Sequence, residues 1–312
     1  MELVIKTETM QGAEAVVLEN DRLRCVCLPE HGGKIASLYR KDKNFELLFQ
    51  NPNKNYRKAK PGAAFGDYEA CGFDDAFPNI DAGRAQTGRG ETDYFDHGEI
   101  WTAPFDVALE PDGVSLSYAS PFLGYRYRKH LSLEGDALTL RYAVSNESMY
   151  TFPCIWACHC LVNVHPVMKI LFPRGVNRVQ NVFDSPLLGE AGALYRFPAD
   201  LAADGERYDF SGALDARRAS MLKIYCADAL QEGLCGYRYP AQGVEALFAY
   251  DAKQLPYLGF WATAGGYRGD VNCALEPTNG FYDSIELAQK NGKCGELKPG
   301  ETLAFSLQIS VR

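Results

Sequence analysis

The sequence lacks several features that define whole classes of protein. No stretch reaches the ~18 consecutive apolar residues that a membrane-spanning helix needs, so we expect no membrane partner. Basic residues are outnumbered, because 32 Lys and Arg stand against 40 Asp and Glu and give a net charge of −8. Proteins that bind nucleic acid usually carry the opposite sign. These absences argue against a membrane or nucleic-acid role.

The chain also lacks an ordered cysteine framework. Its ten cysteines include no C-x-x-C pair and follow no regular spacing, unlike a zinc site or a disulfide scaffold. The opening segment "MELVIKTETMQGAEAVV" is acidic and polar in its middle, unlike a signal peptide. We therefore expect reduced thiols and a cytoplasmic location. A chain of 312 residues buries roughly 75% of its unfolded surface, so it needs neither a disulfide nor a metal for stability.

Helical periodicity is scarce, and strand periodicity takes its place. In "ALTLRYAVSN", at 137–146, apolar residues occupy every second position, and "ETLAFSLQISV" at 301–311 repeats the pattern. Such alternation is typical of half-buried strands, and turn signals such as "PDG" at 111–113 separate the runs. Many short strands at this spacing predict an all-β fold, a sandwich or a barrel. We expect a single domain over residues 1–312.

Two stretches, roughly 51–96 and 181–220, lack this alternation and are rich in loop-forming residues. We interpret the second as loops around short strands. Long loops in a compact domain are unusual and often functional, so both stretches are candidates for the rim of a binding site.

The segment "IWACHCLVNVHP", at 155–166, places a histidine between two cysteines. If 154–164 is a strand, Cys158 and Cys160 share one face while His159 lies on the other. A metal held by all three residues would have to break the strand. The pattern favours small buried cysteines that pack like alanine or valine, and it leaves His159 either as a structural histidine or as a residue with chemistry of its own.

Two further residues have the same two interpretations. His97, in "DYFDHGEIW", lies at the mouth of a strand that we expect to begin near Glu99, or it is simply a turn residue. Glu276, in "NCALEPTNG", ends an apolar strand and precedes a proline. Partial desolvation there raises the pKa of a carboxylate and suits it to act as a base near neutral pH. A solvated glutamate at a strand end is the alternative.

At this point the sequence resembles a known family. The segments "LPEHGGKIASLYRKDKNFELLFQNP", "GFDDAFPNI", "DHGEIW", "IWACHCLVNVHP", "YLGFWAT", "ALEPTNG" and "LKPGETLAFSLQI" follow one another along nearly the whole chain. Their order is similar to that in the aldose 1-epimerase (galactose mutarotase-like) superfamily. The resemblance implies a large antiparallel β-sandwich, in agreement with the alternation.

The resemblance also implies roles for individual residues. His97 matches a histidine that contacts the sugar near its ring oxygen, and His159 matches the general acid for that oxygen. Glu276 matches the general base for the anomeric hydroxyl, and Trp261 lies where an aromatic residue packs near the sugar. The implied reaction is the interconversion of the α and β anomers of a monosaccharide, without metal or cofactor. We expect a neighbouring carboxylate to raise the pKa of His159, the implied general acid.

Three other sugar contacts are candidates on looser grounds. The galactose-specific pattern has an arginine before the first histidine, and here Arg84 and Arg89 occur in a different context. Asp251 is a possible equivalent of an aspartate that binds sugar hydroxyls. Phe77 is one of several aromatic residues that flank the motifs and offer a flat face. These departures leave the identity of the sugar open.

Several functions compete with a mutarotase acting on a free sugar. A hexose-6-phosphate 1-epimerase would need a basic phosphate clamp, for which the sequence offers Arg57, Lys58, Lys60, Arg84 and Arg89. A non-catalytic sugar-binding protein would have lost one of the acid–base residues. A metal-dependent hydrolase would use both histidines and the glutamate as ligands, although no H-E-x-x-H motif supports it. The chain is expected to act as a monomer or a homodimer.

Overall fold

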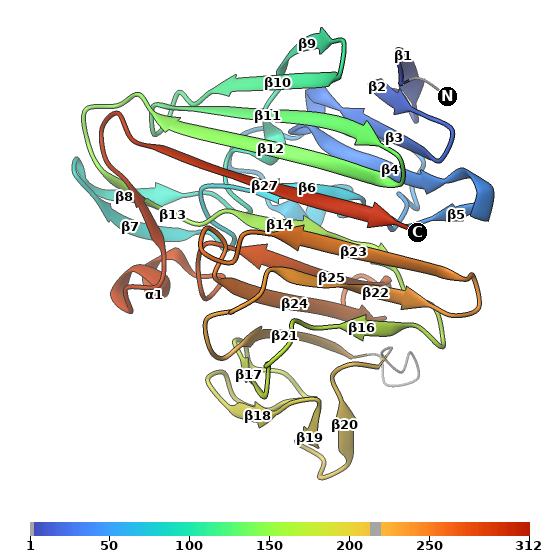
Figure 1. Ribbon diagram of the computed structural model, residues 1–312. Coiled ribbons are helices and arrows are strands. Elements are labelled where there is room, and N and C mark those ends of the chain that lie inside the picture. The colour runs from blue at the N-terminus through green and yellow to red at the C-terminus, as the bar shows by residue number, and fades with distance from the viewer. Residues whose placement is uncertain (1–2, 213–219) are drawn as a thin grey trace.

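The computed structural model describes residues 3–212 and 220–312, and in this part the expected antiparallel β-sandwich is confirmed (Figure 1). Neighbouring strands run antiparallel throughout both large sheets. The larger sheet contains, in spatial order, β1 (Val4–Met10), β2 (Ala13–Glu19), β3 (Leu23–Leu28), β4 (Lys34–Arg40), β6 (Phe73–Ala76), β14 (Ala157–Cys160), β25 (Val271–Thr278), β24 (Tyr257–Ala264), β21 (Met221–Cys226), β17 (Arg178–Asn181) and β18 (Leu194–Arg196), with β5 (Phe45–Glu46) paired to β4 and β15 (Val162–Asn163) paired to β25.

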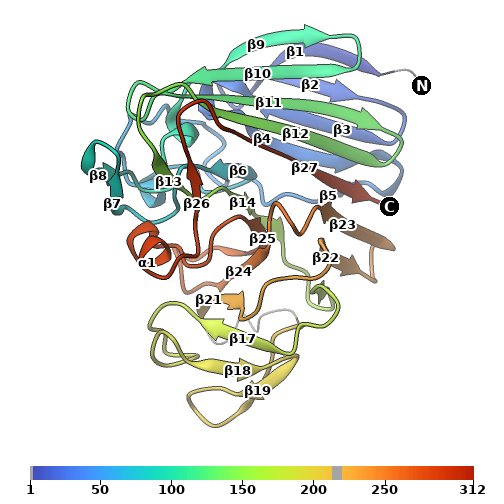
Figure 2. The ribbon, with the colours of Figure 1, turned by 60° about the vertical axis from the view of Figure 1, so that its left-hand side comes forward.

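The second sheet lies against the first, and Figure 2 shows its strands β9–β12 and β27 beside β1–β5. Its strands, in spatial order, are β16 (Lys169–Leu171), β22 (Leu234–Tyr239), β23 (Val244–Tyr250), β27 (Thr302–Val311), β12 (Ala137–Asn146), β11 (Tyr125–Glu134), β10 (Gly113–Ala119) and β9 (Asp106–Glu110).

Smaller elements border these sheets. Three strand pairs are β13 (Phe152–Cys154) with β26 (Gly295–Leu297), β7 (Gly83–Thr87) with β8 (Gly90–Tyr94), and β19 (Ala199–Leu201) with β20 (Arg207–Asp209). The α-helix α1 (Ile285–Lys290) packs on β7 and β13. The 3₁₀ helices are Pro29–His31, Lys41–Lys43, Phe65–Asp67 and Ile100–Thr102. Within the described residues, no helix is long and apolar enough to cross a membrane.

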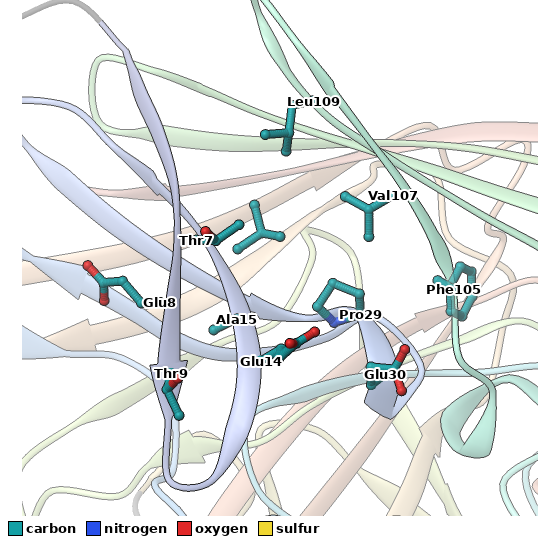
Figure 3. A pocket seen from close by; sticks show the side chains of 11 residues that line it. Thr7, Glu8, Thr9, Glu14, Ala15, Pro29, Glu30, Phe105, Val107 and Leu109 are labelled. Atoms are coloured by element: carbon teal, nitrogen blue, oxygen red, sulfur yellow. The ribbon is translucent and has the colours of Figure 1, made fainter.

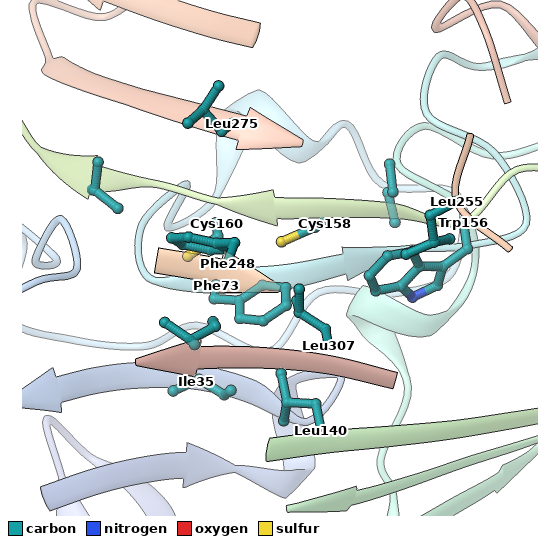
Figure 4. Packing of buried hydrophobic residues seen from close by; sticks show 14 of the residues in the cluster. Ile35, Phe73, Leu140, Trp156, Cys158, Cys160, Phe248, Leu255, Leu275 and Leu307 are labelled. Atoms are coloured by element: carbon teal, nitrogen blue, oxygen red, sulfur yellow. The ribbon is translucent and has the colours of Figure 1, made fainter. Parts of the chain in front are cut away.

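The core fills the space between the inner faces of the two sheets (Figure 4). Leu140 of β12 and Leu307 of β27 point into it from one side, and Phe73 of β6 and Cys158 of β14 point into it from the other. The alternation expected for 137–146 and 301–311 is confirmed, because the apolar positions of β12 and most of those of β27 are buried. All ten cysteines are free, and only Cys294 is partly exposed.

Three expectations need correction. The expected strand at 154–164 is divided, because Ile155, Trp156 and Leu161 separate β13, β14 and β15. No strand begins near Glu99; that carboxylate is buried, accepts hydrogen bonds from three hydroxyl groups and precedes the 3₁₀ helix Ile100–Thr102. The stretch 51–96 is not all loop, since it contains β6, β7 and β8.

The stretch 181–220 does consist of loops around short strands, as expected, up to Gly212. Its segment 213–219 lies outside the described residues.

Candidate active site

The register of the larger sheet brings His159 and Glu276 together. Ala157 of β14 pairs with Thr278 of β25, and Val162 of β15 pairs with Cys273 of β25. Both pairs fit one antiparallel register, in which Glu276 occupies the position across from His159. Residues in such positions have Cβ atoms about 4.5–5.5 Å apart. Because Cys158 faces the core, both side chains stand on the outer face of the sheet.

Two more strands extend this outer face. On β24, Gly259 pairs with Glu276, and on β21, Lys223 pairs with Trp261 of β24. Trp261 is partly exposed, meets Tyr267 edge-on with ring centroids 5.5 Å apart, and donates a hydrogen bond from Nε1 to Asn272. Four adjacent strands thus carry the histidine, the glutamate, the lysine and the tryptophan on one surface.

His97 reaches the same surface from the loop after β8. Its backbone is left-handed, with φ of 55°, and the next residue, Gly98, has φ of 77°. A Cβ on Gly98 would lie 2.1 Å from the carbonyl oxygen of Phe77, so only glycine fits there. The His97 ring then lies 5.1 Å from the His159 ring, centroid to centroid, and nearly perpendicular to it.

Contacts with its neighbours fix the orientation of His97. Its Nδ1 lies 2.8 Å from Oδ1 of Asp96, and the ring of Phe65 stacks on it at a centroid distance of 3.9 Å. Phe65 also meets His159 edge-on at 5.2 Å. With Nδ1 engaged by the carboxylate, Nε2 of His97 is the ring nitrogen left for a ligand.

Glu276 does not stand alone, because a buried lysine contacts it. Nζ of Lys223 donates a hydrogen bond to Oε2 of Glu276 and lies 3.4 Å from Oδ1 of Asp283. The hydroxyl of Tyr225 donates to the same Asp283 oxygen at 2.7 Å. The other glutamate oxygen, Oε1, is buried and has no hydrogen-bond partner among the described residues.

Burial shifts the pKa values of the acid–base residues. It raises the pKa of Glu276, Lys223 opposes this rise, and Asp283 adds to it. Burial also lowers the pKa of His159 well below its ordinary value, and the positive charges of His97 and Lys223 lower it further. The expected upward shift for His159 is therefore wrong, because burial penalises the charged ring and the neighbouring His97 and Lys223 act in the same direction. Partial burial and the neighbouring Asp283 raise the pKa of Asp81 to about 6.

A cavity of about 170 Å³ lies above these residues. It is below the 300–1,000 Å³ of pockets for drug-sized ligands, which suits a ligand as small as one sugar ring. The residues that line it are Phe65, Ala70, Ile80, Asp81, His97, His159, Leu161, Lys223, Trp261, Tyr267, Asp270, Asn272 and Asp283. Glu276 is not among the lining residues; it contacts one of them, Lys223, and its side chain is only 1% exposed.

A larger hollow of about 480 Å³ lies elsewhere, between β1–β2 and β9 (Figure 3). Threonine and glutamate side chains of β1 and β2 face Val107 and Leu109 of β9 across it. No histidine lines it, so it offers no acid–base pair comparable to that of the smaller cavity.

The structure gives three of the sequence-derived sugar contacts no place in the cavity lining. Arg84 is exposed on the β7–β8 hairpin and pairs with Glu91 and Asp93. Asp251 is exposed in the turn after β23 and accepts a hydrogen bond from the backbone of Lys253. Phe77 is fully buried against Tyr125 and Tyr127 in the core.

The residues proposed for a phosphate clamp are likewise engaged elsewhere or open to solvent. Arg57 pairs with Glu69, and Lys58 pairs with Glu30. Arg89 donates a hydrogen bond to the carbonyl oxygen of Phe122. Lys60 is exposed, and like the others it does not line the cavity.

Sequence reasoning missed Lys223, Asp283, Asp81 and Phe65. A signal for Lys223 was present, because a lysine between Leu222 and Ile224 interrupts the otherwise apolar strand "MLKIYC". The other three lie in irregular segments where polar and aromatic residues are common, and no periodicity marks them.

The architecture is that of the galactose mutarotase-like proteins. The chain is similar to a galactose mutarotase-like protein from Lactobacillus casei, with a TM-score of 0.72, 16% identity, and coverage of 96% of this chain and 100% of the other. It is also similar to a galactose mutarotase related enzyme from Lactobacillus acidophilus, with a TM-score of 0.67, 16% identity and coverage of 96% and 97%.

A galactose mutarotase-like protein from Clostridium acetobutylicum gives a TM-score of 0.65 at 15% identity, with coverage of 100% and 99%. No protein-family model and no curated protein sequence matches the chain. At these identities the likeness shows the fold, and any activity has to be argued from the site.

Proposed function

We propose that the protein is an aldose 1-epimerase that interconverts the α and β anomers of a free monosaccharide. The observation that carries this proposal is the position of Glu276 across from His159 on adjacent strands, beneath a cavity of sugar-ring size. Ring opening needs a base for the anomeric hydroxyl and an acid for the ring oxygen on the same edge of the sugar. A carboxylate and an imidazole in this arrangement meet that need.

In the proposed reaction, Oε1 of Glu276 takes the proton from the anomeric hydroxyl while His159 gives a proton to the ring oxygen. The bond between the anomeric carbon and the ring oxygen breaks, and the open-chain aldehyde forms. Rotation about the bond next to the aldehyde carbon presents its other face. The ring oxygen then attacks that carbon, its proton returns to the histidine, and Glu276 returns its proton to the new anomeric hydroxyl.

Other residues that line the cavity have binding roles in this proposal. Trp261 offers a partly exposed aromatic face, against which the apolar face of a pyranose can pack. Nε2 of His97 is directed to the sugar near its ring oxygen, and Asp81 accepts hydrogen bonds from sugar hydroxyls. No step requires a metal or a cofactor.

The charges at the cavity favour an unphosphorylated sugar. Asp81, Asp270 and Asp283 line it, and Lys223, its one lysine, is already bonded to Glu276. A phosphate group, with charge near −2, would meet these carboxylates without a basic clamp. This charge balance disfavours the hexose-6-phosphate alternative.

The metal-dependent alternative finds no support in the positions of the ligand atoms. Oε2 of Glu276 is engaged by the Lys223 ammonium. Among the described residues, the group whose donor atoms converge as metal ligands would is Glu110, Asp112 and His130, on and beside strands β9 to β11. His97, His159 and Glu276 do not form such a group.

The test is NMR exchange spectroscopy of a panel of free aldoses and their 6-phosphates, with and without the protein. We expect faster exchange between anomers of at least one free aldose and little effect on its phosphate. Glu276→Gln should lower that rate by about 10²–10⁴-fold, the usual contribution of one acid or base group. The matched control is Asp251→Asn, which makes the same carboxylate-to-amide change outside the cavity.

Two results would refute the proposal. One is the absence of accelerated exchange with every aldose in the panel. The other is a wild-type rate in Glu276→Gln on the preferred sugar. If a sugar binds to the wild-type protein without faster exchange, the non-catalytic sugar-binding alternative gains the support instead.

A further inference from the structure

The candidate base, Glu276, has a buried cationic partner, Lys223, that lies in none of the motifs noted in the sequence. Lys223 is 6% exposed at its side chain, and its Nζ bonds to Oε2 of Glu276 and approaches Oδ1 of Asp283. Burying an ammonium group is costly unless it is paired and hydrogen-bonded. The lysine therefore belongs to a specific arrangement rather than to a solvated surface.

The sheet is built to allow this contact. Lys223 is on β21 and Glu276 is on β25, so β24 lies between them. At the crossing point β24 carries Gly259, and a Cβ there would lie 3.2 Å from Oε2 of Glu276 and 3.3 Å from the Tyr225 ring. Because glycine has no side chain, Lys223 reaches across the intervening strand to the carboxylate.

The contact divides the two glutamate oxygens between two tasks. Oε2 is held by the ammonium, while Oε1 has no partner among the described residues. We propose that Lys223 is a positioning residue: its ammonium fixes the Glu276 carboxylate with Oε1 toward the sugar and keeps it ionised, and Asp283 weakens this effect by competing for the same ammonium. This inference rests on the proposed function.

The groups that face Glu276 come from several elements. Lys223 and Tyr225 lie on β21, His159 on β14, and Asp283 in the segment after β25. His97 approaches from the loop after β8, and Asp283 also raises the pKa of Asp81, beyond β6. Of these, Lys223 and His97 lower the pKa of Glu276, and Asp283 raises it.

Two substitutions should therefore move the acidic limb of the pH–rate profile in opposite directions. Lys223→Met removes the opposite charge, so Glu276 should stay protonated to higher pH. The midpoint of the acidic limb should move to higher pH by about 1 unit or more. Asp283→Asn removes a like charge and frees the ammonium for Glu276, so the midpoint of the acidic limb should move to lower pH. Lys223→Arg keeps the charge and should give a smaller displacement than Lys223→Met.

The readout combines anomer exchange with a direct titration. The ¹³C signal of the Glu276 side-chain carboxyl, assigned by its loss in Glu276→Gln, is followed against pH in wild type and each variant. KM should change little in Lys223→Met, while kcat on the acidic side of the profile should fall. A lysine with a purely structural role would lower activity at every pH and leave both the limb and the carboxyl titration in place.

The outcomes separate this inference from the proposed function. If wild type accelerates no anomer exchange, the function fails, but the carboxyl titration still decides the role of Lys223. If the midpoint of the Glu276 titration is the same in wild type, Lys223→Arg and Asp283→Asn, the inference is overturned. This holds even if Lys223→Met does not fold.

Discussion

The alkaline side of the pH–rate profile tests the assignment of His159 as the general acid. The acid must carry its proton when the sugar ring opens, and burial, together with His97 and Lys223, holds the pKa of His159 below its ordinary value. Raising the pH therefore removes the active form early. We expect the rate of enzyme-catalysed anomer exchange to fall with rising pH already in the acidic range, below the pH at which an ordinary histidine loses its proton.

The direction of the shift sets a lower limit on the size of this fall. A histidine of ordinary pKa, about 6.5, is half protonated at pH 6.5 and only ~1% protonated at pH 8.5. His159 titrates below that value, so its protonated form is scarcer still at pH 8.5. The rate should fall at least ~50-fold between the rate maximum and pH 8.5.

On the acidic side, burial raises the pKa of Glu276, so the base loses its ionised form at higher pH than an exposed glutamate does. The two shifts move the limbs toward each other. The profile should be a narrow bell, with a maximum at mildly acidic pH.

The assay is polarimetry or NMR exchange on the preferred aldose from pH 4.5 to 9, with the spontaneous rate subtracted at each pH. A plateau from pH 7 to 8.5 would refute the assignment of His159 as the acid. It would point to His97, whose Nδ1 lies 2.8 Å from the Asp96 carboxylate and whose ring is 5.1 Å from that of His159. The variants His97→Ala and His159→Ala then show which histidine sets the alkaline limb.

Three further predictions concern binding, geometry and stability. Trp261→Ala removes the aromatic face in the cavity and should raise KM by up to about tenfold with a smaller change in kcat, whereas Trp261→Phe should retain most of the affinity in steady-state kinetics. Gly259→Ala places a methyl group 3.2 Å from Oε2 of Glu276. It should lower kcat without changing the circular dichroism spectrum. An unchanged kcat would show that the position of the carboxylate is not critical. Lys129→Met leaves the fully buried carboxylate of Asp75 without its ammonium partner. Urea denaturation should show a free energy of unfolding lower by about 3–5 kcal/mol. Adding Asp75→Asn to this variant should recover part of that loss.

The fold could be predicted from the sequence because its signal is local. Alternation at 137–146 and 301–311 depends only on which positions face the core, and β12 and β27 follow it. The same reasoning placed His159 on the face opposite Cys158 and Cys160, where the structure has it. Local alternation could not show that the expected strand at 154–164 is interrupted, since its side chains alternate in the same way on both sides of the breaks.

The site depends on contacts between distant segments, and these could be predicted only in part. Resemblance of short motifs pointed to His97, His159, Glu276 and Trp261, which the structure brings to one region. The pairing of Lys223 with Glu276 spans 53 positions in the sequence and crosses a third strand, so no local pattern contains it. The pKa of His159 is lowered mainly by its burial and then by His97 and Lys223; the sequence does not show this degree of burial, which is why it led to the opposite sign.

The division of the larger sheet into two faces explains how a stable sandwich carries a polar site. Its inner face is filled by apolar groups such as Phe73 and Cys158, which belong to the main core, while the outer face carries smaller apolar clusters beside the polar groups. There, Glu276 and His159 stand on central strands that are bonded on both sides, which holds an acid–base pair more firmly than loops do. His97 and Phe65, by contrast, come from loops, so substitutions in those loops should change affinity for the sugar more readily than they change the acid–base chemistry. Three carboxylates, Asp81, Asp270 and Asp283, line the cavity beside the single lysine, Lys223. Under the proposed function they would accept hydrogen bonds from the hydroxyls of a neutral sugar and repel an anionic one.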